Sequence, residues 1–297
     1  MLSMQPTSES GRTPEVARIN GREGHDISVL ERGLHYGDGL FETIACLGGQ
    51  PRFLARHLAR LGGGCERLRI PLTDTAELSR EVCELAAGTA RAIVKVLVTR
   101  GAAVTRGYAP SGSEHATRIT LRYAWPADDP LLAERGVRVR VATLRLGENP
   151  ALAGLKHCNR LEQVLARAEW SDPDISESLM FSSSGALVSG TMSNVFLVRD
   201  AALLTPRLER CGVAGVMRAV VLAAAATAGV AAEERLLAAE DLAAAREIFL
   251  TSALIGIRPV RELSGAPLTV GPVTRRLQAA LAPLLATAGA GSAHDHA

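Results

Sequence analysis

The sequence predicts an α/β (α+β) enzyme of two domains, and three observations lead to this fold class. Apolar, strand-like runs alternate with amphipathic helix patterns in both halves of the chain. The 297 residues are enough for two ordinary domains, each with its own core. Between the halves, residues 126–136 begin with the Pro- and Asp-rich composition of a linker.

The first domain is expected over residues 15–125. Leu54, Leu58 and Leu61 recur at helical spacing and form the apolar face of a predicted helix. A glycine-rich turn at 36–39 leads into an apolar strand. The expected strands lie at 16–19, 27–29, 40–44, 92–99 and 118–123, and the expected helices at 54–67 and 75–87.

The second domain is expected over residues 137–285. A helix after residue 160 carries Leu161, Val164, Leu165 and Ala168 at i, i+3, i+4 and i+7. Its expected strands lie at 137–143, 177–182, 194–198 and 247–251, and further helices at about 213–229 and 273–285. The polar N-terminus, 1–14, and the Gly-, Ala- and His-containing tail, 286–297, are expected to be disordered.

Composition excludes several classes of protein. The net charge is +2, the arginines are dispersed and aromatic residues are few, so we expect no nucleic acid partner. The longest apolar stretch, 219–232, is too short to span a bilayer, and no secretory signal is visible. Five scattered cysteines and two tail histidines form no metal or disulfide pattern. A cytoplasmic enzyme without a metal is therefore the expectation.

Lysine usage singles out one candidate catalyst. Of the 33 basic residues only Lys95 and Lys156 are lysines. Arginine can replace lysine as a surface cation but not as a nucleophilic amine, because its guanidinium stays protonated. Lys156 is therefore either a covalent catalyst or a surface residue kept by chance. Lys95 lies in an apolar strand pattern, where a single lysine is typical of an edge or rim position.

Three further features suggest that the chain binds a phosphate group. Gly212 and Gly215 flank the start of a helix, where unpaired N–H groups attract anions. Arg60 lies on an amphipathic helix, and Ser252 follows an apolar strand. Each feature alone is also typical of an ordinary turn, a surface charge or a strand end. Together with a reactive amine they indicate pyridoxal 5'-phosphate, whose aldehyde forms an imine with lysine.

Two long motifs carry a family resemblance. Residues 31–43 (ERGLHYGDGLFET) and 152–165 (LAGLKHCNRLEQVL) resemble the aminodeoxychorismate lyases of the fold-type IV pyridoxal-phosphate superfamily. This superfamily also contains branched-chain and D-amino-acid aminotransferases. The resemblance implies a smaller N-terminal α/β domain and a larger C-terminal pseudo-barrel domain, joined into a homodimer. It also implies conversion of 4-amino-4-deoxychorismate, a small-molecule substrate, to 4-aminobenzoate and pyruvate for folate synthesis.

The resemblance assigns roles residue by residue. Lys156 matches the lysine that forms the Schiff base, and Arg60 matches the arginine that binds the cofactor phosphate. The remaining matches are cofactor contacts by Tyr36, Ser252 and the backbone N–H groups of Val216 and Met217, and substrate contacts by Arg106, Tyr108 and Asn194.

One position departs from the family pattern. Superfamily members usually carry a glutamate five residues before the asparagine of the N-[LVF]-F strand, where it keeps the pyridinium nitrogen protonated. Here that position is Ser189, ahead of Asn194. A hydroxyl supplies no negative charge to raise the pKa of the ring nitrogen. We therefore expect a weaker electron sink, which disfavours transamination more than a reaction that ends in an aromatic product.

Two other functions fit parts of the pattern. A class IV aminotransferase acting on D-amino acids or branched-chain amino acids would share the motifs. A non-catalytic relative that binds cofactor or partner without turnover would also share the fold. Retention of Lys156 favours an enzyme over the non-catalytic relative.

Overall fold

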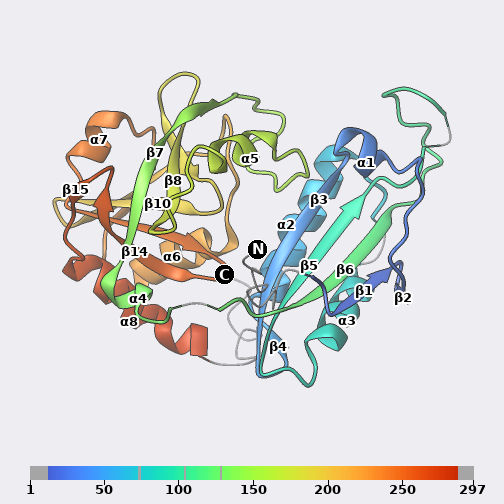
Figure 1. Cartoon of the computed structure of the whole chain (residues 1–297), viewed down its shortest axis with the longest axis horizontal. Coiled ribbons are helices and arrows are strands. Elements are labelled where there is room, and N and C mark those ends of the chain that lie inside the picture. The colour runs from blue at the N-terminus through green and yellow to red at the C-terminus, as the bar shows by residue number, and fades with distance from the viewer. Residues whose placement is uncertain (1–12, 73–74, 104, 128, 287–297) are drawn as a thin grey trace, which may run out of the picture. The chain divides into compact units, whose positions relative to one another are not determined.

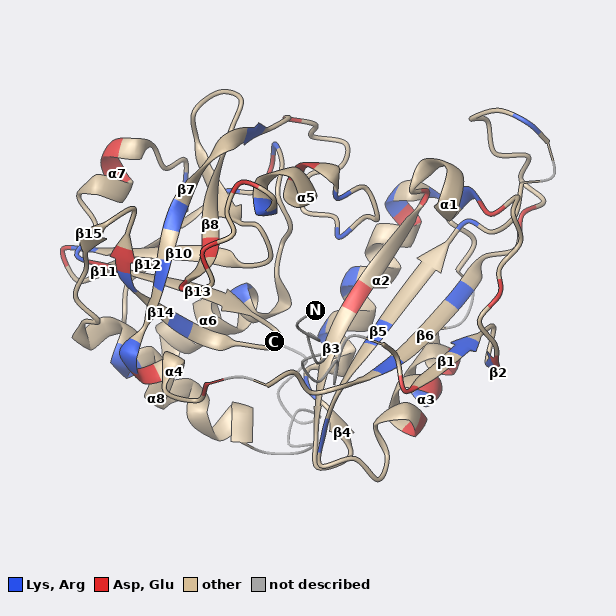
Figure 2. Cartoon of the chain, viewed as in Figure 1, with Lys and Arg blue, Asp and Glu red and all other residues tan. Residues whose placement is uncertain are grey.

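A computed structural model describes residues 13–72, 75–103, 105–127 and 129–286. These residues form two compact units, 13–127 and 129–286 (Figure 1). The predicted mixed α/β class is confirmed. The disorder predicted for 1–14 and 286–297 falls almost entirely outside the described residues. In both units cationic and anionic side chains are interspersed along helices and strands (Figure 2).

The first unit is a six-stranded antiparallel sheet with two helices on one face. Its strand order is β2-β1-β6-β5-β3-β4. Helices α2 and α3 contact each other and the sheet (Figure 1). The strands are β1 (Val16–Ile19), β2 (Arg22–Glu23), β3 (Gly39–Leu47), β4 (Gln50–Pro51), β5 (Arg91–Thr99) and β6 (Thr117–Ala124), and the helices α1 (Arg32–Tyr36), α2 (Leu54–Leu68) and α3 (Thr75–Ala86).

Alternation along β5 explains which face is buried. Val94, Val96 and Val98 are fully buried, whereas Lys95 between them is half-buried and lies 5.4 Å from the centre of the Phe41 ring. Lys95 was expected at an edge or rim position; the edge position is wrong, because β5 pairs with β3 on one side and β6 on the other. The lysine stem is accommodated on the second face of a central strand.

The second unit is a curled mixed sheet of nine strands. The order is β12-β11-β10-β13-β14-β7-β8-β9, with β15 beside β14. The last strand, β9, also contacts β10 and β11, so the sheet folds back on itself as a pseudo-barrel. The strands are β7 (Val137–Leu146), β8 (Ile175–Ser182), β9 (Leu187–Gly190), β10 (Asn194–Arg199), β11 (Ala202–Pro206), β12 (Ala232–Arg235), β13 (Glu247–Ser252), β14 (Gly256–Leu263) and β15 (Ala266–Pro267).

Helices cover the outside of this curled sheet. Helices α6 and α8 contact each other and β13, and α5 contacts β7 and β8 (Figure 1). Helix α4 falls within 126–136, the segment expected as a linker, and contacts β14 of the second unit. The helices are α4 (Leu132–Arg135), α5 (Leu161–Arg167), α6 (Val216–Thr227), α7 (Ala239–Ala243) and α8 (Pro272–Ala286).

Two cores lie on opposite faces of the strands β10 and β13. Val195 and Leu197 belong to a large apolar cluster on one face. Phe196, between them, pairs across the strands with Phe249, and the two rings stack with centroids 4.9 Å apart. Both rings are fully buried. Burial on both faces makes these strands continuous apolar runs rather than alternating ones.

The apolar spacing on α5 marks an exposed face. Leu161, Val164 and Leu165 are 76%, 60% and 59% exposed, while Ala166 is the buried residue of the helix. Apolar residues at this spacing normally face a core. Within the described chain these three do not, so α5 presents an apolar stripe on the surface of the second unit.

The stacked phenylalanines give the first testable prediction. Phe196→Ala should lower the free energy of unfolding by about 3–5 kcal/mol, because it removes a buried ring and leaves a cavity. Leu131→Ala, at a residue that is 40% exposed, is the control and should cost less than about 1 kcal/mol. Urea unfolding followed by circular dichroism measures both. A loss for Phe196→Ala no larger than for the control would contradict this view of the core.

Candidate functional site

The segment that carries Lys156 is joined by backbone hydrogen bonds to the turn that opens α6. The N–H of Gly154 donates to the carbonyl of Gly212 at 3.0 Å, and the N–H of Ala214 donates to the carbonyl of Gly154 at 3.0 Å. Lys156 is two residues beyond this junction and half-buried. The structure thus brings together the predicted amine and the predicted phosphate-binding turn, which are more than fifty residues apart in sequence.

Both glycines of this turn are needed for close packing. Gly212 has φ 89°, and a Cβ there would lie 2.7 Å from Cγ1 of Val188. A Cβ on Gly215 would lie 2.0 Å from Oδ1 of Asn194. The amide of Asn194 also donates to the carbonyl of Val213 at 2.9 Å. Asn194 therefore packs against this turn and is hydrogen-bonded to it. Its predicted contact with substrate stays a prediction.

The start of α6 has the features of an anion site. Gly215 is the N-cap and provides no side-chain acceptor for the first-turn N–H groups. Val216 and Met217 follow as buried residues, 6% and 1% exposed. The helix has 12 residues, so its dipole places positive potential at this end. Arg218 does not add a cation to the site, because Glu234 pairs with it at 2.5 Å.

Two serines of the predicted site lie on strands that each adjoin β10. Ser189 is buried on β9, directly after Val188, and its hydroxyl donates to the carbonyl of Gly190 at 2.8 Å. Ser252 ends β13, one residue after Thr251, which pairs with Asn194 of β10. In the second unit the turn before α6 thus contacts Asn194, the residue before Ser189 and the segment that carries Lys156, and Ser252 lies on the strand beside Asn194.

A buried carboxylate in this region was not predicted. Glu177 on β8 is 5% exposed and accepts hydrogen bonds from the N–H groups of Ser178, Thr191 and Met192 and from the hydroxyls of Thr191 and Ser193. These donors fix residues 190–193, between Ser189 and Asn194. A glutamate inside an apolar strand pattern was the available signal, since such a group needs partners when it is buried.

In the first unit, Arg60 belongs to a buried charge cluster. Its Nε and Nη2 donate to the two carboxylate oxygens of Glu42 at 2.7 and 2.5 Å. Nδ1 of His57 lies 2.6 Å from the same carboxylate. Burial raises the pKa of Glu42, but hydrogen bonds from His57 and Arg60 outweigh it and hold the pKa below its ordinary value. The carboxylate therefore stays ionised at neutral pH.

The aromatic and arginine residues predicted to contact cofactor or substrate lie together in the first unit. The rings of Tyr36 and Tyr108 are 5.2 Å apart. The buried Arg32 lies 5.0 Å from the Tyr36 ring and donates to the carbonyls of Gly107 at 3.2 Å and Tyr108 at 2.7 Å. Arg106, in the same loop, is exposed. Arg32 thus ties this loop to α1, a role that the sequence did not suggest.

The residue after the lysine is a partly buried histidine. Burial, with a smaller contribution from the nearby Arg160 cation, lowers the pKa of His157 to about 4. Nε of Arg160 donates to the carbonyl of His157 at 2.8 Å, and Nδ1 of His157 is buried without a hydrogen-bond partner in the described chain. The imidazole is therefore neutral at physiological pH and adds no charge beside Lys156.

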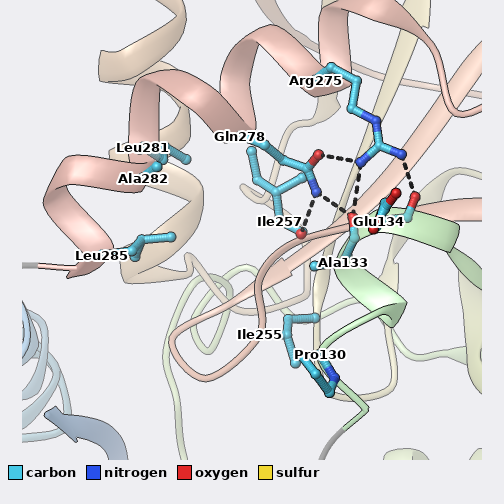
Figure 3. A pocket seen from close by; sticks show the side chains of 10 residues that line it. All are labelled: Pro130, Ala133, Glu134, Ile255, Ile257, Arg275, Gln278, Leu281, Ala282 and Leu285. Carbon is cyan, nitrogen blue, oxygen red and sulfur yellow. Dashed lines mark hydrogen bonds between the residues drawn. The ribbon is translucent and has the colours of Figure 1, made fainter.

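A separate cavity of about 360 Å³ lies between α4, α8 and the turn before β14 (Figure 3). Apolar side chains such as Ile255 and Leu281 line it, and the guanidinium of Arg275 donates to the carbonyls of Ala133 and Glu134. None of the predicted site residues lines this cavity. The guanidinium of Arg275 and the amide of Gln278 are paired within its wall, and the candidate site lies elsewhere in the fold.

The described residues form neither a metal-binding cluster nor a helix that could cross a membrane. No group of three or more His, Cys, Asp or Glu side chains there is placed to hold a metal ion. Among the helices that the structure describes, none combines the length and the apolar character that a membrane crossing requires.

Comparisons with known proteins agree on one family. Residues 39–263 match the model of the amino-transferase class IV family. An aminodeoxychorismate lyase of Vibrio harveyi is 33% identical over 264 residues, which cover 88% of this chain and 97% of that protein.

Solved structures give the same result. The crystal structure of 4-amino-4-deoxychorismate lyase from Pseudomonas aeruginosa has a TM-score of 0.87 and 47% identity, covering 90% of this chain and 98% of that one. A branched-chain amino acid aminotransferase from Escherichia coli has a TM-score of 0.82 and 25% identity, covering 92% and 95%. The resemblance read from the sequence motifs is confirmed.

The low pKa of His157 predicts how acid affects stability. Between pH 6.5 and about 4 the unfolded chain takes up a proton on this imidazole while the folded chain does not, so folding stability falls as pH falls through this window. After allowance for solvent screening, the loss is on the order of 1 kcal/mol. His157→Gln should remove it. His25→Gln, at an exposed histidine, should keep the parent's acid loss.

Urea unfolding at pH 7 and pH 4.5 measures the three proteins side by side. An acid loss in His157→Gln as large as in the parent would contradict the burial of a neutral imidazole at this position.

Proposed function

Because the chain belongs to the class IV aminotransferase family, we propose that it is a pyridoxal-phosphate-dependent lyase that converts 4-amino-4-deoxychorismate to 4-aminobenzoate and pyruvate. The observation that carries this proposal is that backbone hydrogen bonds join the segment of Lys156 to the turn that opens α6. Its support from relatives is the 47% identity to a lyase over nearly the whole of both chains.

The residues present fit the cofactor. The N-terminus of α6, at Val216 and Met217, has no side-chain cap and therefore suits the phosphate. We assign Arg60 as a further phosphate ligand, and Tyr36 and Ser252 as contacts of the ring and its substituents. When bound, pyridoxal phosphate supplies an aldehyde that joins reversibly to an amine and a ring that withdraws electrons from the substrate.

Lys156 has two tasks in this proposal. Its Nζ would hold the cofactor before substrate binds, and once released it would be available as a base. The released amine takes the proton from the ring carbon that bears the substrate nitrogen. Cleavage of the bond between the ring carbon and the ether oxygen then releases enolpyruvate, which takes up a proton to become pyruvate, and leaves an aromatic ring. An amine released beside the reacting carbon is already placed to act as a base. The neutral imidazole of His157 adds no second charge beside this amine.

Substrate carboxylates need cationic or hydrogen-bonding partners. We assign this role to Arg106 and Tyr108, with Asn194 as a weaker candidate. The loop 105–108 is fixed through Arg32, whose guanidinium holds the carbonyls of Gly107 and Tyr108. A preorganised loop lowers the entropy cost of binding a small dicarboxylate.

We also propose that the enzyme is a cytoplasmic homodimer. The exposed apolar stripe of α5, formed by Leu161, Val164 and Leu165, is a surface that a second copy of the chain would cover. All five cysteines are free thiols, which suits a reducing compartment.

The second candidate is an aminotransferase on the same fold. It is favoured by the similarity to the branched-chain aminotransferase structure from Escherichia coli. The two candidates differ in product. A lyase releases pyruvate from aminodeoxychorismate, whereas an aminotransferase exchanges the amino group of a D- or branched-chain amino acid with 2-oxoglutarate.

The lysine pair gives a matched test of the lyase. Lys156→Arg keeps the charge but removes the nucleophilic amine, so pyruvate release from enzymatically generated aminodeoxychorismate should fall by at least about 10³-fold. Lys95→Arg changes the other lysine of the chain and should keep activity within about twofold. Coupled assay of pyruvate measures both. Comparable activity in the two variants would exclude Lys156 as the catalyst.

The serine at position 189 gives a second test. Ser189→Glu places a carboxylate where the ring nitrogen is expected, which should raise the pKa of that nitrogen and shift the cofactor absorption band. The ratio of lyase to transaminase turnover should fall. Ser184→Glu, at an exposed serine in the turn between β8 and β9, is the control. An unchanged spectrum together with an unchanged ratio in Ser189→Glu would refute this role for Ser189.

A further inference from the structure

We propose that Glu42 is a positioning residue that aims the guanidinium of Arg60 at the cofactor phosphate. On this view Glu42 sets how strongly the protein prefers pyridoxal phosphate over unphosphorylated pyridoxal. The inference deepens the proposed function and rests on the role assigned there to Arg60.

A two-point contact fixes the plane of the guanidinium. Oε1 of Glu42 accepts from Nε of Arg60 at 2.7 Å, and Oε2 accepts from Nη2 at 2.5 Å. Two parallel charge-assisted bonds leave a planar fork little freedom to rotate. The Nε edge therefore faces the sheet, and the opposite edge of the guanidinium is turned away from Glu42.

Burial makes the carboxylate a rigid anchor. Glu42 lies on β3 with its side chain 1% exposed, whereas the side chain of Arg60 on α2 is 16% exposed. The anchored end is thus inside the unit, and the cation reaches toward its surface. Anchors of this kind hold a functional side chain within the narrow range of geometries that binding requires.

A second side chain of the same helix holds the anchor. His57 is three residues before Arg60 on α2, so both face β3. Its Nδ1 lies 2.6 Å from Oε2 of Glu42, and the ring is 1% exposed. One carboxylate oxygen is therefore shared by a histidine and an arginine, which ties the helix to the strand at the position of the predicted phosphate ligand.

The chain offers a matched comparison for a purely structural role. Glu81 on α3 is another buried carboxylate of the same unit, 5% exposed, which pairs with Arg118 and accepts from Thr120. Glu77 pairs with the same arginine, so loss of the Glu81 charge removes one of two carboxylate partners of Arg118. Glu81→Gln therefore removes a buried carboxylate charge from the same unit without touching Arg60.

The test measures the affinities of the full-length protein, stripped of cofactor, for pyridoxal phosphate and for pyridoxal by absorbance titration. Glu42→Gln should weaken pyridoxal phosphate by roughly tenfold or more, because an amide cannot accept both bonds from Arg60. Its affinity for pyridoxal should stay within about twofold of the parent. Glu81→Gln should change neither of these two affinities. Arg60→Gln should abolish the preference for pyridoxal phosphate over pyridoxal. The double variant with Glu42→Gln should bind pyridoxal phosphate no more weakly than Arg60→Gln alone.

Three results would overturn the proposal. In the first, Glu42→Gln weakens both ligands equally, which is the mark of a structural role alone. In the second, the losses from Glu42→Gln and Arg60→Gln add in the double variant. In the third, Arg60→Gln keeps the parent's preference for the phosphorylated ligand. Failure of the lyase assignment is seen separately, as a parent that binds pyridoxal phosphate with the full preference but releases no pyruvate.

Discussion

The hydrogen-bonded junction between Gly154 and the glycine turn before α6 is the constraint on which the candidate site depends. It fixes the chain two residues before Lys156 against the turn that opens α6, whose first N–H groups have no side-chain cap. Close packing of Gly215 on Asn194 and of Gly212 on Val188 leaves no space for side chains there. Backbone hydrogen bonds and glycine packing thus fix the main chain of the candidate site, and this main chain positions Lys156.

Much of this could be predicted because the relevant signals are local. The long helices at 54–68, 75–86 and 272–286 were expected within one or two residues, since each has a clear 3.6-residue pattern. The scarcity of lysine pointed to Lys156, because arginine can replace lysine as a cation but not as a nucleophilic amine. The motif resemblance then identified the family, which the comparisons confirmed.

The rest depends on partners distant in sequence. The strand expected at 27–29 is absent, and the short strands β9 and β11 were missed, because short strands are stabilised by neighbours rather than by their own pattern. The longer β14 was also missed, since Pro259 interrupts its strand pattern. Lys95 was expected at an edge or rim position, yet its strand is central. The anchoring carboxylates Glu42 and Glu177 stand among strand-forming residues, but the sequence does not show which groups pair with them. Only the fold shows that their donors come from a helix and a turn elsewhere in the chain.

The most direct test of the central claim is reduction of the cofactor-loaded protein with borohydride, followed by proteolysis and mass spectrometry. The account predicts a stable pyridoxyl adduct on the peptide that contains Lys156. An adduct on Lys95 or on the N-terminal amine, or no adduct in protein that retains the cofactor's absorbance, would contradict it.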